Sequence, residues 1–378
     1  QKDYDEFYRE LYPFAEDAMF HIHINVDYPF NLTGILYFPK IKGQVDLQKN
    51  KIQLYSNQVF VTDNVEGIVP DFLSLLHGVI DSPDIPLNVS RSYLQSDGNV
   101  KKISSHISKK VADKLVELFK ADRKAFEEKW EDLKIFIEYG SVTDEKFYDR
   151  VKDIILLKTT KGEFFTWNEF QEKTKANQTN KDGKHVVLYT NELDKYFDRI
   201  ESAYDRGYQV VEMEGPLSSH FIQTLEQKVE NVSFARIDSD SLEKLIDTGE
   251  EIPSKLSESE REELKTFFTE NFDKEKYDVQ IESLSETESP ILLNQMEFIR
   301  RMKEQQMAGG ANFMGTFPEK YTMQVNANHP TIAKLMAADG EEKTKLSKQL
   351  FDLALLSSGM LTGEALANFI KNSINSLK

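Results

Sequence analysis

Cysteine is absent from the 378 residues of this sequence. Disulfide bonds, thiolate nucleophiles and cysteine-based zinc sites are therefore excluded, and a reducing cytoplasm is permitted. Long apolar runs are absent as well, because no stretch of about 18 apolar residues and no secretion signal occurs. We therefore expect a cytoplasmic protein without a membrane partner.

Basic residues are outnumbered by acidic ones: 47 Lys and Arg stand against 64 Asp and Glu, and the net charge is −17. A chain of this sign repels nucleic-acid phosphates, so we expect no nucleic-acid partner. Phosphate-binding glycine loops are also missing, because no Walker-type loop precedes a Lys-Ser or Lys-Thr pair and Gly309, Gly310 and Gly315 form no dinucleotide turn. The sequence thus contains no recognisable nucleotide pocket of its own.

The length predicts two or three domains. Residues 246–258 contain few apolar anchors and predict a linker between a middle domain at 1–245 and a C-terminal domain at 259–378. The expected fold class is α/β, or α+β when the whole chain is counted. The middle domain should contain a mixed sheet, a helical segment and a small parallel unit of three αβα layers.

The elements follow from the spacing of apolar residues and from the short connections between them. In the middle domain the predicted strands are 20–26, 33–38, 52–55, 59–62, 186–189, 208–213 and 232–236, and the predicted helices are 69–76, 101–139, 191–207 and 218–228. The C-terminal domain is predicted to contain a helix capped by Ser257 or Ser259 and ending at Phe272, strands at 277–281 and 321–325, and a closing helix hairpin.

Two patterns could carry chemistry. His21 and His23 lie two apart on a predicted strand and point to one face, but no third ligand accompanies them, so we predict no metal site. In the second pattern, Ser90 caps a helix that places Arg91 in its first turn and Gln95 one turn later. Arg91 is either a group that reaches an anion or an ordinary surface arginine.

Four segments resemble the middle domain of the ninety-kilodalton heat-shock chaperone family in its bacterial form. They are 25–39, 55–63, 75–81 and 84–95, and the resemblance extends over essentially the whole chain. It implies an upstream ATP-binding domain, which agrees with a start at Gln1 inside a longer polypeptide. The sequence ends at Lys378 without the acidic Glu-Glu-Val-Asp tail of cytosolic eukaryotic members, so partners that read that tail are not expected.

The resemblance assigns a catalytic role to Arg91, which contacts the γ-phosphate of ATP held by the upstream domain, and a supporting role to Gln95 and Asn88. An arginine presented in this way stabilises charge on the transferred phosphoryl group. The expected cofactors are therefore ATP and Mg in the full-length protein and none in this segment, which alone should be inactive as an enzyme.

Two apolar regions have a family role and a plain packing alternative. The stretch 293–307 carries an apolar stripe that family members use, on a helix, to contact client proteins, although such a stripe is more often core. Its residues are Met296, Phe298, Ile299 and Met302.

The last two helices, separated by 359–363, either pack on their own domain or pair with a second copy into a four-helix bundle. The predicted dimer residues are Leu350, Leu353, Leu366, Phe369, Ile370 and Ile374.

The expected function is therefore that of a chaperone body, which binds unfolded or partly folded clients, forms a homodimer and completes ATP hydrolysis together with the upstream domain. Other chaperones are a further candidate class of partner. The alternatives are a self-standing hydrolase or transferase built on 186–236, for which no nucleophile and base are found, and a purely structural dimeric scaffold.

Overall fold

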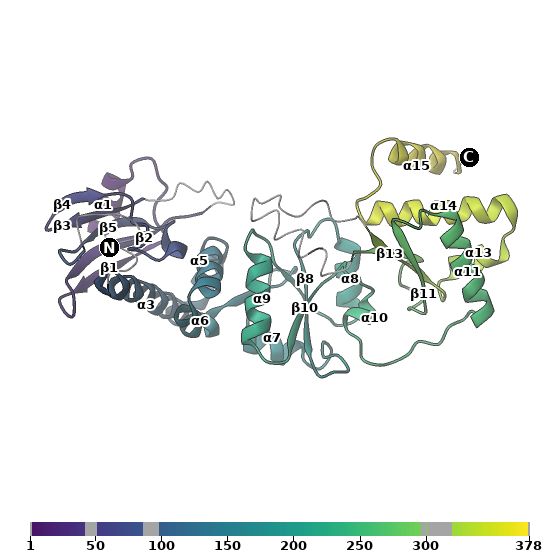
Figure 1. Cartoon of the computed structure of the whole chain (residues 1–378), viewed down its shortest axis with the longest axis horizontal. Helices are drawn as coiled ribbons and strands as arrows, with labels where there is room; N and C mark the ends of the chain where they lie inside the picture. Colours follow the sequence, from purple (N-terminus) through teal and green to yellow (C-terminus); the bar gives the residue numbers. More distant parts are fainter. Residues whose placement is uncertain (1, 42–50, 86–97, 296–299, 301–319, 377–378) are drawn as a thin grey trace. The chain divides into compact units, whose positions relative to one another are not determined.

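The computed structural model describes residues 2–41, 51–85, 98–295, 300 and 320–376 (Figure 1). The chain forms two compact units. The first contains Gln1–Leu156 and Phe164–Asn168, and the second contains Leu157–Glu163 and Glu169–Lys378. The predicted linker 246–258 lies inside the second unit, and the division that it would make there remains a prediction. No helix in the described ranges is long and apolar enough to cross a bilayer.

The first unit is built on a five-stranded sheet in the order β1-β2-β5-β3-β4. Its strands are β1 (Phe20–Val26), β2 (Leu32–Phe38), β3 (Lys51–Ser56), β4 (Val59–Thr62) and β5 (His77–Asp81). Neighbours are antiparallel except β3 and β5, which are parallel, so the sheet is mixed as predicted. Gly78 has a φ of +143°, and a Cβ there would lie 2.1 Å from the Ile35 carbonyl oxygen, so this close strand approach requires glycine.

The helices of the first unit partly correct the sequence analysis. They are α1 (Lys2–Leu11), α3 (Gly98–Ala121), α4 (Arg123–Glu128), α5 (Trp130–Thr143) and α6 (Glu145–Val151), with 3₁₀ turns at Asp71–Leu73 and Lys152–Ile154. The predicted helix 101–139 is interrupted, because the Asp122 side chain caps a new helix by accepting from the Ala125 N–H. The predicted helix 69–76 is wrong, because only one 3₁₀ turn forms there.

The second unit begins with a parallel sheet in the order β10-β8-β9. Its strands are β8 (His185–Thr190), β9 (Val210–Glu212) and β10 (Val232–Arg236). Figure 1 shows α8 (Phe197–Asp205) and α9 (Ser218–Lys228) on opposite sides of this sheet, which confirms the predicted αβα layers. The helix expected from Asn191 begins instead at Phe197, after the N-cap Tyr196. Strand β6 (Leu156–Lys158) and helix α7 (Trp167–Thr174) contain residues of both units, β7 (Phe164–Thr166) belongs to the first unit, and α10 (Leu242–Leu245) belongs to the second.

A second sheet follows in the order β11-β13-β12, with β13 parallel to β11 and antiparallel to β12. Its elements are α11 (Glu258–Asn271), β11 (Tyr277–Glu282), β12 (Ile291–Asn294), β13 (Tyr321–Asn326), α13 (Pro330–Ala337), α14 (Gly340–Ser357) and α15 (Gly363–Ser376). Ser257 caps α11 as predicted and forms a capping box with Glu260. Strand β12 was not predicted, and it takes the first residues of the stretch 293–307. The α/β fold class is confirmed.

Candidate functional site

The structure describes only some of the predicted site residues. Arg91, Gln95 and Asn88 lie outside the described residues. The same holds for the predicted client-contact residues, which are Met296, Phe298, Ile299 and Met302. The predicted dimer residues on α14 and α15 are described, and they form the first part of the candidate site.

Helix α14 has a buried face and an exposed face. Leu350 and Ala354 are each 4% exposed and belong to the core of the β11–β13 sheet. Leu353 is 47% exposed and Leu356 42% exposed on the same helix. Leu350, one of the predicted dimer residues, is therefore covered by the sheet of its own chain. Leu353, in contrast, is exposed in the single chain and is therefore accessible to a partner.

Helix α15 carries apolar side chains that its own chain does not cover. Ile370 is 49% exposed and Ile374 is 55% exposed, while Leu366 and Phe369 are half-buried. Over the described residues 363–375, no side chain of α15 is buried. A helix of 14 residues is marginal in water without packing, so this helix needs a partner surface to be stable. We use the name α14–α15 surface for the following apolar residues: Leu353 and Leu356 of α14, and Leu366, Phe369, Ile370 and Ile374 of α15.

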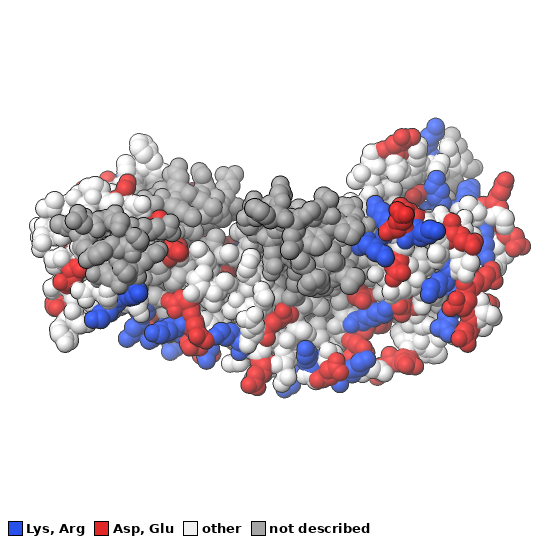
Figure 2. All heavy atoms as spheres, viewed as in Figure 1, with Lys and Arg blue, Asp and Glu red and all other residues white. Residues whose placement is uncertain are grey.

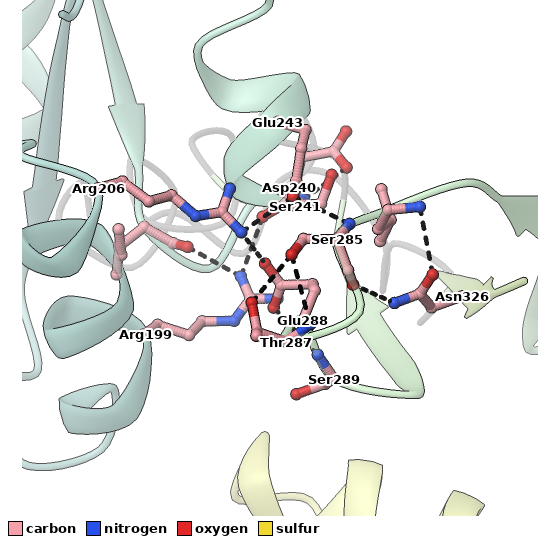
Figure 3. Close-up of polar contacts among 12 residues, drawn as sticks. Arg199, Arg206, Asp240, Ser241, Glu243, Ser285, Thr287, Glu288, Ser289 and Asn326 are labelled. Atoms are coloured by element: carbon pink, nitrogen blue, oxygen red, sulfur yellow. Dashed lines mark hydrogen bonds and ion pairs between the residues drawn. The ribbon is translucent and has the colours of Figure 1, made fainter. Parts of the chain in front are cut away.

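A polar junction joins the parallel sheet to the β11–β13 sheet and forms the second part of the site (Figure 3). The Arg206 guanidinium lies 2.9 Å from a Glu243 carboxylate oxygen and 3.5 Å from one of Glu288. Glu288 is 9% exposed, and Arg206 is its ion-pair partner among the described residues. The junction thus holds one cation between two carboxylates.

A second arginine adds neutral partners to the junction. Arg199 Nη1 donates to the carbonyl oxygens of Ile237 at 2.8 Å and Asp240 at 3.0 Å, and Nη2 donates to Asn294 Oδ1 at 3.4 Å. The Asp240 carboxylate in turn accepts from Gln324 Nε2 at 2.6 Å. Because Gln324 and Asn294 are buried in β13 and β12, these bonds tie the second sheet to the loop after β10.

Asn326 completes the junction from the end of β13. Its Nδ2 donates to the Ser285 carbonyl oxygen at 2.8 Å, and its Oδ1 accepts from the Leu284 N–H at 3.2 Å. The Ser285 N–H donates to Glu243 at 3.3 Å. Asn326 is fully buried, so each of these bonds replaces water that the amide has lost. The junction is therefore built from buried polar groups whose hydrogen bonds fix its geometry.

A buried ion pair lies beside the junction, on the wall of a hollow of about 330 Å³. Burial by itself raises the pKa of the Asp238 carboxyl, but hydrogen bonds from Arg236 outweigh burial and hold that pKa below its ordinary value. Burial and the neighbouring Asp238 raise the pKa of Tyr196 to about 12. Arg236 Nη2 donates to Asp238 Oδ2 at 2.6 Å, so the charges are paired.

The two histidines considered as metal ligands have other partners. His23 Nδ1 lies 2.9 Å from the Tyr4 hydroxyl, and the His21 ring stacks on the Tyr4 ring at 3.9 Å between centroids. Among the described residues, no group of three or more potential ligands could hold a metal ion.

A comparison with protein families identifies the family to which the chain belongs. The family model described as Hsp90 protein matches residues 1–377. The chain belongs to the Hsp90 family.

Individual members of the Hsp90 family are similar to this chain over nearly its whole length. Chaperone protein HtpG of Porphyromonas gingivalis is 46% identical over 98% of this chain and 64% of its own length. Chaperone protein htpG of Bacteroides fragilis is 44% identical over 99% of this chain and 65% of its own length. The chain thus spans a little under two thirds of these relatives. The alignment with the first runs over 441 positions, so that relative carries residues without a counterpart in the 378 of this chain.

The sequence analysis of this Hsp90 chain missed the polar junction. Its main charged members lie far apart in the sequence, at Arg199, Arg206, Glu243 and Glu288, and they form no motif. The one available signal was polar residues inside strands, namely Asn294 in β12 and Gln324 and Asn326 in β13. Buried polar positions in a strand require hydrogen-bond partners, and this requirement points to a contact.

Proposed function

We propose that this chain is the client-binding and dimerising body of an Hsp90-type chaperone, acting in the cytoplasm. Membership of the family supports the chaperone activity, and the names of the bacterial relatives agree with it. The main support for a dimer is the α14–α15 surface. On these last two helices the exposed apolar residues are Leu353, Leu356, Ile370 and Ile374.

A second copy of the chain is the partner that fits the α14–α15 surface. Twofold pairing lets each helix pair cover the other, and it is the commonest symmetry of homo-oligomers. Each apolar side chain that becomes fully buried contributes about 1.5 to 3 kcal/mol, and symmetry counts it twice. The pairing would also give α15 the packing that a single chain lacks.

The second part of the proposal concerns ATP and Mg bound by a domain outside this segment. Arg91 stabilises charge on the γ-phosphate, and Asn88 and Gln95 support it. The chain alone does not turn over ATP in this proposal. When combined with the ATP-binding domain, it supplies a charge-stabilising arginine, which is worth several orders of magnitude in phosphoryl transfer.

The third part assigns client contact to Met296, Phe298, Ile299 and Met302. Flexible thioether and aromatic side chains suit a surface that binds many partners. Other chaperones remain candidate partners. A self-standing hydrolase or transferase receives no support from the comparisons, since the family and the relatives are chaperones.

Two measurements test this proposal. Sedimentation equilibrium at tens of micromolar should give a dimeric mass for the chain and a monomeric mass for its Ile370→Asp variant, with little change in the melting of the first unit. Phe14→Asp is the matched control, because Phe14 is a fully exposed aromatic residue that belongs to the first unit and not to α14 or α15. A monomeric unmodified chain contradicts the dimer.

The client role is tested by suppression of aggregation of a heat-unfolded protein. The chain should suppress aggregation, and Met302→Asp should weaken suppression with little change in melting temperature. Suppression that is absent, or unaffected by Met302→Asp and Phe298→Asp, contradicts client contact at these residues.

A further inference from the structure

A hollow of about 700 Å³ in the first unit has no role in the proposed function. It lies between α3, α6 and the turn that follows β1. Its cationic lining residues are Lys101, Lys102, Lys109, Lys146 and Arg150, against the carboxylates of Asp144 and Asp149. Figure 2 shows Lys and Arg side chains gathered over the region of α3. On a chain of net charge −17, such a local excess of cations is unusual.

The four lysines of this hollow are not engaged elsewhere. None of them makes an ion pair within the described part of the chain, whereas Arg150 Nη1 lies 3.2 Å from Asp113 Oδ1. Asp144 is already committed, since its carboxylate accepts from Ser108 Oγ at 2.7 Å and from the Phe147 N–H at 3.1 Å. The lining therefore holds five cationic side chains against two carboxylates, one of which is already hydrogen-bonded, and keeps an excess of positive charge.

The lining of the hollow also contains two buried phenylalanines and a histidine. Phe30 and Phe147 are 5% and 1% exposed, and the His106 ring meets the Phe30 ring edge to face at 5.6 Å. His106 Nε2 is buried and has no hydrogen-bond partner in the described structure. Burial lowers the pKa of His106, and Lys110 and Lys109 lower it further while Asp113 opposes them. The ring is therefore neutral near pH 7.

We propose that this hollow binds a small anion carrying two or more phosphoryl groups. Unpaired lysine ammonium groups are compact donors that suit phosphate oxygens. The volume falls in the range of small-molecule pockets, about 300 to 1,000 Å³, and exceeds what a single phosphate fills. A long polyanion is disfavoured because the acidic remainder of the surface repels it. The proposal goes beyond the chaperone function and does not depend on it.

Calorimetric titration of the whole chain with inorganic tripolyphosphate tests the site, at low ionic strength so that screening is weak. We expect one tripolyphosphate per chain, bound at least about 10-fold more tightly than orthophosphate. Lys102→Gln and Lys109→Gln should each weaken binding by about 3- to 10-fold. Lys120→Gln is the matched control, since Lys120 is exposed in the last turn of the same helix and does not line the hollow.

The His106 ring provides a second readout. A bound polyphosphate adds negative charge beside Lys109, Lys110, Asp113 and Asp144, so it should raise the pKa of His106 toward or above its ordinary value. Imidazole proton shifts followed against pH, with and without tripolyphosphate, measure this change. An unaltered His106 titration, no binding, or equal weakening by Lys120→Gln overturns the proposal, because general surface charge would then explain the data.

Discussion

Helices α3 and α15 are both amphipathic, yet they differ in what covers their apolar faces. Helix α3 buries seven residues, among them Val100, Ile103 and Ile107, against the elements of its own unit. Helix α15 leaves Ile370 and Ile374 about half exposed. The two patterns in sequence are alike, so periodicity identifies an apolar face but does not say whether the same chain or a second one covers it.

The largest effect should come from a charge in the buried face of α3. Ile107 is fully buried, so Ile107→Asp places a carboxylate in the core and should cost more than about 4 kcal/mol, which unfolds the first unit. Circular dichroism melting measures this loss. Ile374→Asp on α15 is the matched control and should leave melting of that unit unchanged. Equal losses would remove the distinction between the two helices.

The same comparison can be made within α14. Leu350→Ala removes a buried side chain and should destabilise the second unit by about 2 to 5 kcal/mol. Leu353→Ala, three residues further on, should cost about 0.5 kcal/mol or less in the separated chain but should weaken dimerisation. Urea unfolding and sedimentation measure the two quantities. Large unfolding losses for Leu353→Ala would assign that residue to the core.

A third test concerns a buried carboxyl on α5. Burial raises the pKa of Glu138 to about 8, with Lys134 opposing and Glu131 adding to the rise. Between its ordinary value of 4.5 and about 8, the folded chain keeps a proton that the unfolded chain has lost. Stability should therefore fall as pH rises through this window and level off above it.

Glu138→Gln removes that penalty and should stabilise the first unit by about 3 kcal/mol at pH 7, with little effect at pH 4. Thermal melting at several pH values measures the difference. Glu128→Gln is the control, because Glu128 is exposed on the preceding helix and is not among the groups that act on Glu138. A gain that is independent of pH would contradict the buried-acid explanation.

The smallest effect is expected at the polar junction. Arg206→Gln leaves Glu243 and Glu288 facing each other without their cation, and partial exposure should limit the cost to about 1 to 2 kcal/mol. Adding Glu288→Gln should recover most of it, since the unpaired charge is then gone. Urea unfolding of the single and double variants gives the coupling, and additive losses would show that the pair is not an interacting unit.

Sequence reasoning succeeded where a pattern had one dominant cause. A serine cap at Ser257 or Ser259 was predicted because a serine side chain satisfies the first N–H groups of a helix, and Ser257 is the cap. The strands β1 and β8 were found from their apolar spacing. The prediction of an α/β fold with a small parallel sheet followed from the order of these elements.

The failures also have physical causes. Strand β5 lies between β2 and β3, and three of its five residues are buried, so it lacks the alternation that identifies a strand. The burial of Leu350 was not foreseen because its helix has apolar residues on two faces, and sequence alone does not show which face the β11–β13 sheet covers. The polar junction was not predicted because its ion pairs form no sequence motif, and only tertiary packing brings Arg206 to Glu288.

The polar groups of the junction also determine how the heat capacity changes when the two sheets that it joins separate. Its contacts are amide, carboxylate and guanidinium groups, including Asn294, Gln324 and Asn326. Exposing polar surface lowers heat capacity, whereas exposing apolar surface raises it. Parting of the sheets at this junction should therefore show a small or negative heat-capacity change and a nearly linear dependence of its free energy on temperature. Unfolding of either hydrophobic core, in contrast, should follow a strongly curved stability profile.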